Sequence, residues 1–304
     1  MTSRFAAPTT LEAALAILAA DDAARPVAGG TDLVVAARQG RKDLPESLVA
    51  IDRIAELARH DVAAGALILG ALTSHDWLAG SPDVGATWTA LADACAIVGS
   101  PATRGTGTIG GNLMNASPAA DTTAPLVVLG AEVTLQGAGG ITRTVPVADL
   151  ATGPGRTVAA AGELLTSVTV PRPADGSGSA YIRLEYRRAM EIAVVGAAAL
   201  VTLSGEGRIA AARVALTAVA PTIVRAPEAE AALVGASAVA ASFRAAGEAA
   251  AAAARPIDDV RASADYRRAM LVVVVARALA AAAARARGGL IPIPASRWAH
   301  GQEV

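Results

Sequence analysis

Two glycine turns, far apart in the chain, constrain its fold more than any other feature. The first reads AGGTD over residues 28–32, and the second reads TIGGN over residues 108–112. Each turn places two adjacent glycines beside a threonine and a short polar side chain. Because glycine tolerates positive φ angles, such turns can present consecutive backbone N–H groups as a concave nest that binds anions. Two nests on facing parts of a fold could hold a diphosphate from both sides.

The second turn also completes a G-x-G-x-x-G pattern through Gly105, Gly107 and Gly110. In a Rossmann dinucleotide site this pattern directly follows a strand and directly opens a helix. Here Pro101 interrupts the approach, and Pro118 falls where the helix should continue. The pattern therefore gives little support to a Rossmann site, and each turn taken alone is typical of an ordinary tight turn.

The composition narrows the class of protein. With 304 residues, 53% hydrophobic and 17% charged, the chain is long enough for two or three globular domains. A net charge of -1 and 3% aromatic residues argue against a large surface for nucleic acid or anionic lipid. The single cysteine, Cys95, excludes an internal disulfide or a cysteine-ligated iron–sulfur cluster built by this chain alone.

No targeting or metal signal stands out in the chain. The start, MTSRFAAPTT, lacks the features of a secretory signal, and the apolar runs are shorter than a membrane span of about 20 residues. We therefore expect a cytoplasmic protein without a membrane span. His60, His75 and His300 have no paired-ligand spacing, so we expect no metal site.

Apolar periodicity predicts an α+β chain. Short apolar runs at residues 47–52 and 66–73 favour strands, and the clearest helix covers residues 264–286. After a predicted linker at Pro171–Ala180, three alternating segments predict a three-stranded antiparallel sheet followed by helices. We expect two lobes over residues 1–57 and 58–172, a C-terminal sheet-plus-helices domain over residues 177–287, and a tail over residues 288–304.

Four motifs in order carry a family resemblance. They are VAGGTDL (27–33), GTIGGNLMNASPAAD (107–121), GELLTSVTVP (162–171) and YRRAMEIAVVGAAA (186–199). In this order the chain resembles the FAD-binding medium subunit of molybdenum hydroxylases, the group of xanthine dehydrogenase and aerobic carbon monoxide dehydrogenase. The resemblance implies a two-lobed FAD-binding domain of the vanillyl-alcohol oxidase/PCMH type plus a C-terminal domain.

The resemblance also implies which residues bind FAD. The two turns would cradle the diphosphate, Asp121 would bind the ribitol or ribose side, Leu165 would pack on the cofactor and Arg183 would approach the flavin. Some members place an aromatic ring near the flavin where this chain has Val98 or Gly99. The implied set is Val27, Ala28, Gly29, Gly30, Thr31, Asp32, Leu33, Gly107, Thr108, Ile109, Gly110, Gly111, Asn112, Ser117, Asp121, Leu165 and Arg183.

Other charged residues have two interpretations. Arg187, Arg188 and Glu191 form either a salt-bridge cluster at a strand end or a group that borders the flavin. The arginines around the last helix favour a solvated face, with a docking surface for an acidic partner as the alternative; they are Arg261, Arg267, Arg268, Arg277, Arg285 and Arg287. We expect FAD to be non-covalent, because the matched motifs contain no histidine or cysteine.

The function implied by the resemblance is electron transfer within a complex. A small subunit with [2Fe–2S] clusters and a large molybdopterin subunit would supply electrons, in a dimer of heterotrimers. The acceptor would be NAD⁺, O₂ or a quinone-linked carrier. No catalytic residue is assigned to this chain. Two alternatives remain: a free-standing FAD-dependent reductase that turns over with NAD(P)H alone, and a non-enzymatic nucleotide-binding or assembly subunit.

Overall fold

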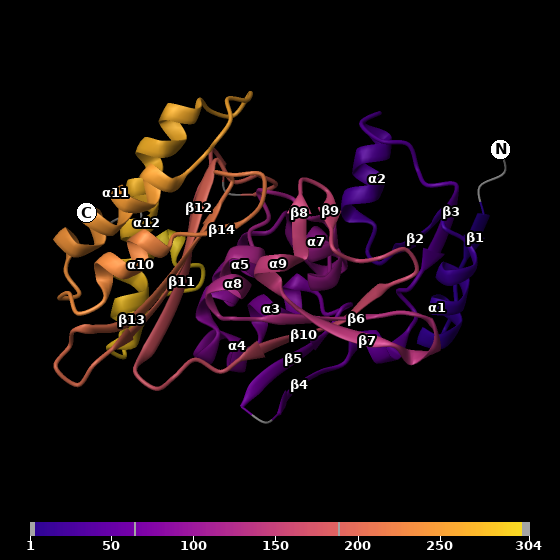
Figure 1. Ribbon diagram of the computed structural model, residues 1–304, viewed down its shortest axis with the longest axis horizontal. Helices are drawn as coiled ribbons and strands as arrows, with labels where there is room; N and C mark the ends of the chain where they lie inside the picture. The colour runs from indigo at the N-terminus through magenta and orange to yellow at the C-terminus, as the bar shows by residue number, and fades with distance from the viewer. Residues whose placement is uncertain (1–3, 64, 188, 300–304) are drawn as a thin grey trace.

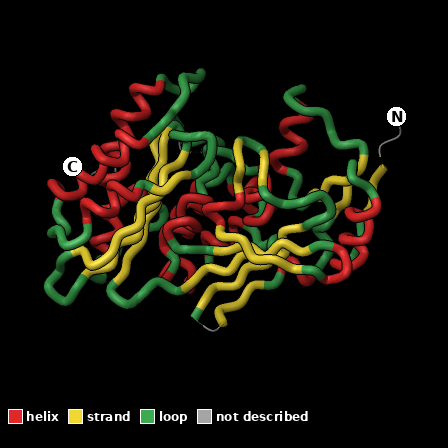
Figure 2. The backbone as a smooth tube through the Cα atoms, in the orientation of Figure 1, coloured by secondary structure: helices red, strands yellow, loops and turns green. Residues whose placement is uncertain are grey.

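A computed structural model describes residues 4–63, 65–187 and 189–299 of the chain. Three main sheets succeed one another along the long axis, with helices between and beside them (Figures 1 and 2). The N-terminal sheet lies at one end, in indigo, and the C-terminal helices lie at the other, in orange and yellow (Figure 1). The chain is an α+β protein, as the sequence predicts.

The first sheet is parallel, with the strand order β1-β3-β2. Helix α1 begins where the Thr10 hydroxyl accepts a hydrogen bond from the Ala13 N–H at 3.3 Å. Its Leu15 and Leu18 side chains are buried in a cluster with residues of this sheet. The bounds are β1 (Arg4–Ala6), α1 (Leu11–Ala20), β2 (Ala24–Val27), α2 (Thr31–Arg38) and β3 (Ser47–Ala50). The first glycine turn therefore joins β2 to α2.

The second sheet is antiparallel, with the strand order β4-β5-β10-β6-β7. Its strands are β4 (His60–Ala63), β5 (Ala66–Gly70), β6 (Glu132–Gln136), β7 (Thr142–Pro146) and β10 (Leu164–Pro171). A separate hairpin consists of β8 (Ala151–Gly153) and β9 (Arg156–Thr157), and short 3₁₀ helices cover Ala55–Ala58 and Ala138–Gly140.

Most helices of this middle part lie between β5 and β6. They are α3 (His75–Gly80), α4 (Pro82–Thr87), α5 (Thr89–Ile97), α6 (Pro101–Thr106), α7 (Ile109–Asn115) and α8 (Thr123–Val128), and α9 (Val147–Leu150) follows β7. Thr108 of the second glycine turn caps α7, and residues 109–112 form the first turn of that helix. Helix α3 ends at Gly80, and Ser81 caps α4, which has Pro82 in its first turn.

The third sheet is antiparallel, with the order β11-β12-β13-β14. Helix α12 packs so closely on it that a Cβ added to Gly178 would lie 2.2 Å from the carbonyl oxygen of Ala282. Helices α5 and α8 contact the sheet from the middle part of the molecule. The bounds are β11 (Ser177–Leu184), β12 (Val195–Leu203), β13 (Ile209–Thr217), β14 (Val224–Arg225), α10 (Pro227–Leu233), α11 (Ala240–Ala253), α12 (Ala264–Ala286) and α13 (Ser296–Ala299).

Two predictions for this region need correction. The meander has a fourth strand, β14, beyond the three expected. The linker predicted at Pro171–Ala180 is shorter than expected, because Ser177–Ala180 belong to β11 and Gly178 to Ala180 are buried. Gly178 allows the close approach of α12, and the Ser179 hydroxyl accepts a hydrogen bond from the Ala90 N–H of α5 at 3.0 Å.

A buried ion pair joins the middle part to the C-terminal part. The Asp93 side chain on α5 is fully buried and accepts hydrogen bonds from Arg285 on α12 at 2.6 and 3.0 Å. The backbone N–H groups of Tyr181 and Ala295 donate to the same carboxylate at 3.1 and 2.8 Å. The prediction that the arginines of the last helix face solvent is therefore wrong at Arg285. It is also wrong at Arg267, which is 3% exposed.

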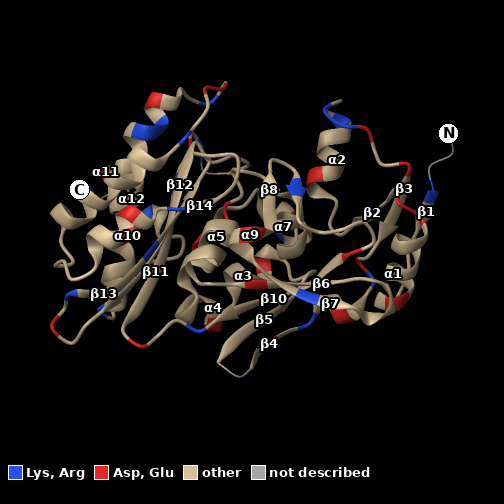
Figure 3. Cartoon of the chain, in the orientation of Figure 1, with Lys and Arg blue, Asp and Glu red and all other residues tan. Residues whose placement is uncertain are grey.

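Helix α12 has the length and apolar composition that could cross a membrane, contrary to the expectation that the apolar runs are too short. In this fold it is a core helix, because it packs on β11, β12 and α11 and half of its most apolar window is buried. Acidic and basic residues are interspersed over all three parts in the view of Figure 3, in keeping with the small net charge.

Candidate cofactor site

The first glycine turn presents unpaired backbone amides. Gly30 has φ +65°, in the left-handed region, and caps the N-terminus of α2. Within the described part of the chain, the backbone N–H groups from Gly29 to Leu33 donate to no acceptor. These amides and the partial positive charge of the helix N-terminus favour an anion, as a phosphate group requires. The free amides predicted for AGGTD are present.

The two glycine turns lie against each other. A Cβ added to Gly29 would lie 1.9 Å from the carbonyl oxygen of Thr106, so only glycine allows this approach. A Cβ on Gly107 would lie 3.6 Å from the Thr31 hydroxyl oxygen. The structure thus brings together residues 28–33 and 107–108, which the sequence predicts as one site. The free backbone amides of residues 29–33, with no side chain on Gly29 or Gly30 to cover them, fit a diphosphate group.

The second turn differs from the expected nest, because its N–H groups are already used. Ile109 and Gly110 donate to the carbonyl oxygens of Thr73 and Ala71, both at 2.9 Å. The Gly111 N–H donates to the Thr108 hydroxyl at 3.1 Å. The prediction of free amides at TIGGN is therefore wrong: Thr108 caps α7 instead. Gly110 serves packing, because a Cβ there would lie 2.7 Å from Ala71.

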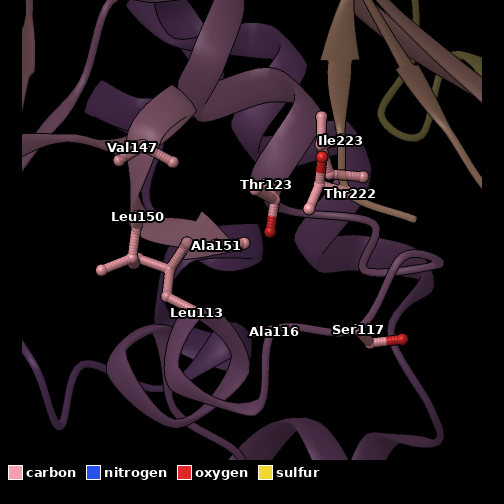
Figure 4. Close-up of a pocket in the computed structure, with 9 residues that line it drawn as sticks. All are labelled: Leu113, Ala116, Ser117, Thr123, Val147, Leu150, Ala151, Thr222 and Ile223. Carbon is pink, nitrogen blue, oxygen red and sulfur yellow. The ribbon is translucent and has the colours of Figure 1, made fainter. Parts of the chain in front are cut away.

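Further along, Asn112 and Ser117 make contacts within the chain. The Thr122 hydroxyl donates to Oδ1 of Asn112 at 2.6 Å, and the Ser117 hydroxyl accepts from the Ala119 N–H at 3.2 Å. Ser117 also borders a cavity of about 10 Å³ (Figure 4). This cavity has room for about one water molecule, so it is far too small for a flavin ring. Its lining is Leu113, Ala116, Ser117, Thr123, Val147, Leu150, Ala151, Thr222 and Ile223.

Asp121 and Arg183 form a buried cluster where the middle part meets β11. Arg183 donates to Oδ2 of Asp121 at 2.5 Å, and the Tyr181 hydroxyl donates to Oδ1 at 2.8 Å. Arg183 also donates from Nε to Glu185 at 2.5 Å. Burial raises the pKa of the Asp121 carboxyl, while the Arg183 guanidinium opposes that rise. The structure brings two predicted site residues together as partners of each other.

The remaining predicted residues are mostly interior. Leu165 on β10 and Ile109 on α7 are buried in one core cluster. Gly99 has φ +51°, and its carbonyl oxygen accepts a hydrogen bond from the Met190 N–H at 3.0 Å. The backbone of Met190 thus lies next to Gly99, one of the two positions where the resemblance implies an aromatic ring in some members. Arg187 pairs with Glu191 at 3.1 Å, whereas Arg188 and the tail residue His300 lie outside the described residues.

A buried histidine–cysteine contact lies under the second turn, and sequence analysis missed it. His75, at the start of α3, donates its backbone N–H to the Gly107 carbonyl at 3.1 Å. Its Nδ1 lies 3.8 Å from the Cys95 sulfur, and both residues are buried. Burial, with a further effect of Arg104, lowers the pKa of His75 from 6.5 to about 4. His75 is therefore neutral, and no local pattern at Ser74–His75 signals its burial.

This fold and this amide-lined turn define an FAD-binding domain with an attached sheet-and-helix domain. Residues 1–173 match the FAD-binding domain in molybdopterin dehydrogenase, and residues 179–282 match the CO dehydrogenase flavoprotein C-terminal domain. The chain belongs to the family of FAD-binding medium subunits of molybdenum hydroxylases, and it is a FAD-dependent oxidoreductase subunit.

Relatives match over almost the whole chain. The carbon monoxide dehydrogenase medium chain of Hydrogenophaga pseudoflava is 34% identical over 92% of this chain and 96% of its own length. The 6-hydroxypseudooxynicotine dehydrogenase complex subunit alpha of Paenarthrobacter nicotinovorans is 34% identical over 91% of this chain and 93% of its own length. A solved structure of the Hydrogenophaga pseudoflava carbon monoxide dehydrogenase has a TM-score of 0.88 and 36% identity, covering 94% of this chain and 98% of that one.

Proposed function

We propose that this chain is the electron-exit subunit of a molybdenum hydroxylase. It would take electrons from [2Fe–2S] clusters of a partner subunit and pass them to an external acceptor. The observation that carries the proposal is the row of free N–H groups from Gly29 to Leu33, held against the second turn in a chain of this family. FAD supplies hydride and single-electron chemistry when bound.

The residues of the two turns would hold the diphosphate. The donors are the backbone amides of residues 29–33 together with the hydroxyl of Thr31. Thr108 and Gly107 would form the opposite wall through close packing, since the amides of residues 109–112 are occupied. We further propose that Leu165 and Ile109 support the site from the core, and that Asp121 and Arg183 define its edge toward the C-terminal domain.

We assign a role to each part of the fold. We take residues 1–57 and 58–172 as the two FAD-binding lobes and residues 177–287 as the C-terminal domain. The buried pair Asp93–Arg285 would keep the C-terminal domain fixed over the site. We expect FAD to be held non-covalently, a view supported by the burial of Cys95 and His75, which are 0% and 2% exposed.

The proposed partners are a small [2Fe–2S] subunit and a large molybdopterin subunit, arranged as a dimer of heterotrimers in the cytoplasm. Support comes from the relatives, which include the medium chain of a carbon monoxide dehydrogenase and a subunit of a dehydrogenase complex. The acceptor would be NAD⁺, O₂ or a quinone-linked carrier.

Purification and reduction experiments test this proposal. The purified chain should show flavin absorption bands. When the neighbouring coding sequences are expressed with it, it should co-purify with one smaller and one larger partner subunit. Its flavin should be reduced on addition of substrate only in the presence of those partners. Rapid turnover of the isolated chain with NAD(P)H would instead indicate a free-standing reductase, and a colourless protein would indicate an assembly subunit.

A further inference from the structure

The charge of Arg183 is already compensated within the chain. Its guanidinium is 0% exposed and contacts the carboxylates of both Asp121 and Glu185 at 2.5 Å. This cluster therefore contains two carboxylates for one cation. The Arg183 guanidinium therefore has no uncompensated charge to offer an anion such as a diphosphate, and a side-chain cation for it would come from another residue.

Arg104 is a cation without such compensation. It lies on α6, whose last residue, Thr106, packs on Gly29 of the first turn. Within residues 4–63, 65–187 and 189–299, no carboxylate lies within 4.0 Å of its guanidinium. Arg104 is half-buried, and Nη1 donates to the Val98 carbonyl oxygen at 3.3 Å. An arginine that served only solubility would extend its head into water.

The electrostatic reach of Arg104 agrees with this inward orientation. Its charge contributes to the low pKa of His75 and opposes the rise in the pKa of Cys95. Both of these residues are buried, and His75 lies directly under Gly107. The Arg104 guanidinium therefore lies beside the Val98 carbonyl and within electrostatic reach of His75, which borders Gly107 at the second glycine turn.

We propose that Arg104 is a cofactor-binding residue that offsets the negative charge of FAD held at the glycine turns. The proposal rests on the site proposed above and deepens it. Arg104 acts by charge and hydrogen bonding, and no covalent or proton-transfer step is involved. A hydrogen-bonding cation that compensates a charged partner should change the affinity about 10- to 100-fold, which corresponds to about 1.4–2.8 kcal/mol.

The test compares the FAD affinity of Arg104→Gln, Arg104→Lys and Arg213→Gln with that of the unaltered protein. Arg213 is a matched control, because its Nη1 also donates to a backbone carbonyl at 3.3 Å, that of Val128, and it has no carboxylate within 4.0 Å in the described chain. FAD is removed, titrated back and followed by flavin fluorescence, and the melting temperature of each FAD-free protein is recorded. We expect Arg104→Gln to bind FAD about 10- to 100-fold more weakly. Arg104→Lys and Arg213→Gln should stay close to the unaltered protein.

Two results would overturn the role of Arg104. One is an affinity of Arg104→Gln equal to that of Arg213→Gln. The other is an FAD-free Arg104→Gln protein that melts far below FAD-free Arg213→Gln, since this would assign Arg104 to folding. Failure of the underlying site looks different: a Gly29→Ala protein would then retain FAD fully, whatever the behaviour of Arg104.

Discussion

Gly29 packs directly against the backbone of Thr106, at the point where α6 ends. A Cβ on residue 29 would lie 1.9 Å from the Thr106 carbonyl oxygen and 2.7 Å from its carbonyl carbon. Because both of these Thr106 atoms belong to the backbone, no change of rotamer can relieve the clash. The contact joins the first turn to the segment that leads into the second, so it fixes the free amides of the first turn in place.

Gly29→Ala should therefore separate the two turns. We expect a loss of about 1–3 kcal/mol in unfolding free energy from overpacking, and loss of bound FAD on purification. Gly105→Ala is the control, because a Cβ there meets nothing within 4 Å and alanine favours the surrounding helix α6. Chemical denaturation and the flavin-to-protein absorbance ratio measure both effects. Equal flavin content in the two variants would contradict the site.

The first turn could be predicted from the sequence because its geometry is local. A short apolar strand, two glycines and a helix follow one another, and Gly30 takes the left-handed conformation that the pattern indicates. The second turn has the same local pattern, yet its amides are occupied. The acceptors Ala71 and Thr73 lie in the segment that follows β5, and nothing in TIGGN indicates that this segment lies beneath it.

Burial of charge was equally hidden from the sequence. Arg285 looks like a residue of a solvated helix face, but its partner Asp93 lies 192 residues away along the chain. A helical pattern shows only which residues share a face, and which face meets another domain is a tertiary property. The same limit explains why Arg183 is predicted near the cofactor while its pairing with Asp121 and Glu185 was not foreseen.

Asp93→Asn should destabilise the junction of the middle and C-terminal parts. It removes the negative charge that faces Arg285, whose side chain is 6% exposed, and leaves a buried cation unpaired. Breaking a buried pair in this way costs about 3–5 kcal/mol. Glu248→Gln breaks the exposed Arg244–Glu248 pair on α11 and should change stability by about 0.5 kcal/mol or less. Urea denaturation measures both, and similar losses would refute a special role for Asp93.

His75 should make folding sensitive to acid. Its pKa falls from 6.5 to about 4 on folding, because burial disfavours the charged imidazole. Between these values the unfolded chain binds a proton that the folded chain excludes, so stability falls as the pH drops through this window. The slope from this group is about 1.4 kcal/mol per pH unit.

His75→Gln should flatten that slope. The unfolding free energy is measured at a series of pH values between 4 and 6.5 for His75→Gln and the unaltered protein. His60→Gln, which removes an exposed histidine on β4, controls for the general effect of losing an imidazole. An unchanged slope in His75→Gln would show that His75 is not the group responsible.

Tyr181 and Asp121 offer a way to separate folding from cofactor binding at the domain junction. Tyr181→Phe removes the hydroxyl that donates to Asp121 at 2.8 Å inside the protein, so we expect a loss of about 1–3 kcal/mol in unfolding free energy. Tyr266→Phe, on the exposed part of α12, should change it by about 0.5 kcal/mol or less.

Asp121→Asn alters the carboxylate itself. If Asp121 also binds the ribitol or ribose hydroxyls, Asp121→Asn should weaken FAD binding more than Tyr181→Phe does. Equal FAD affinity in these two variants, measured by titration of the FAD-free proteins, would restrict Asp121 to holding Arg183 and Tyr181.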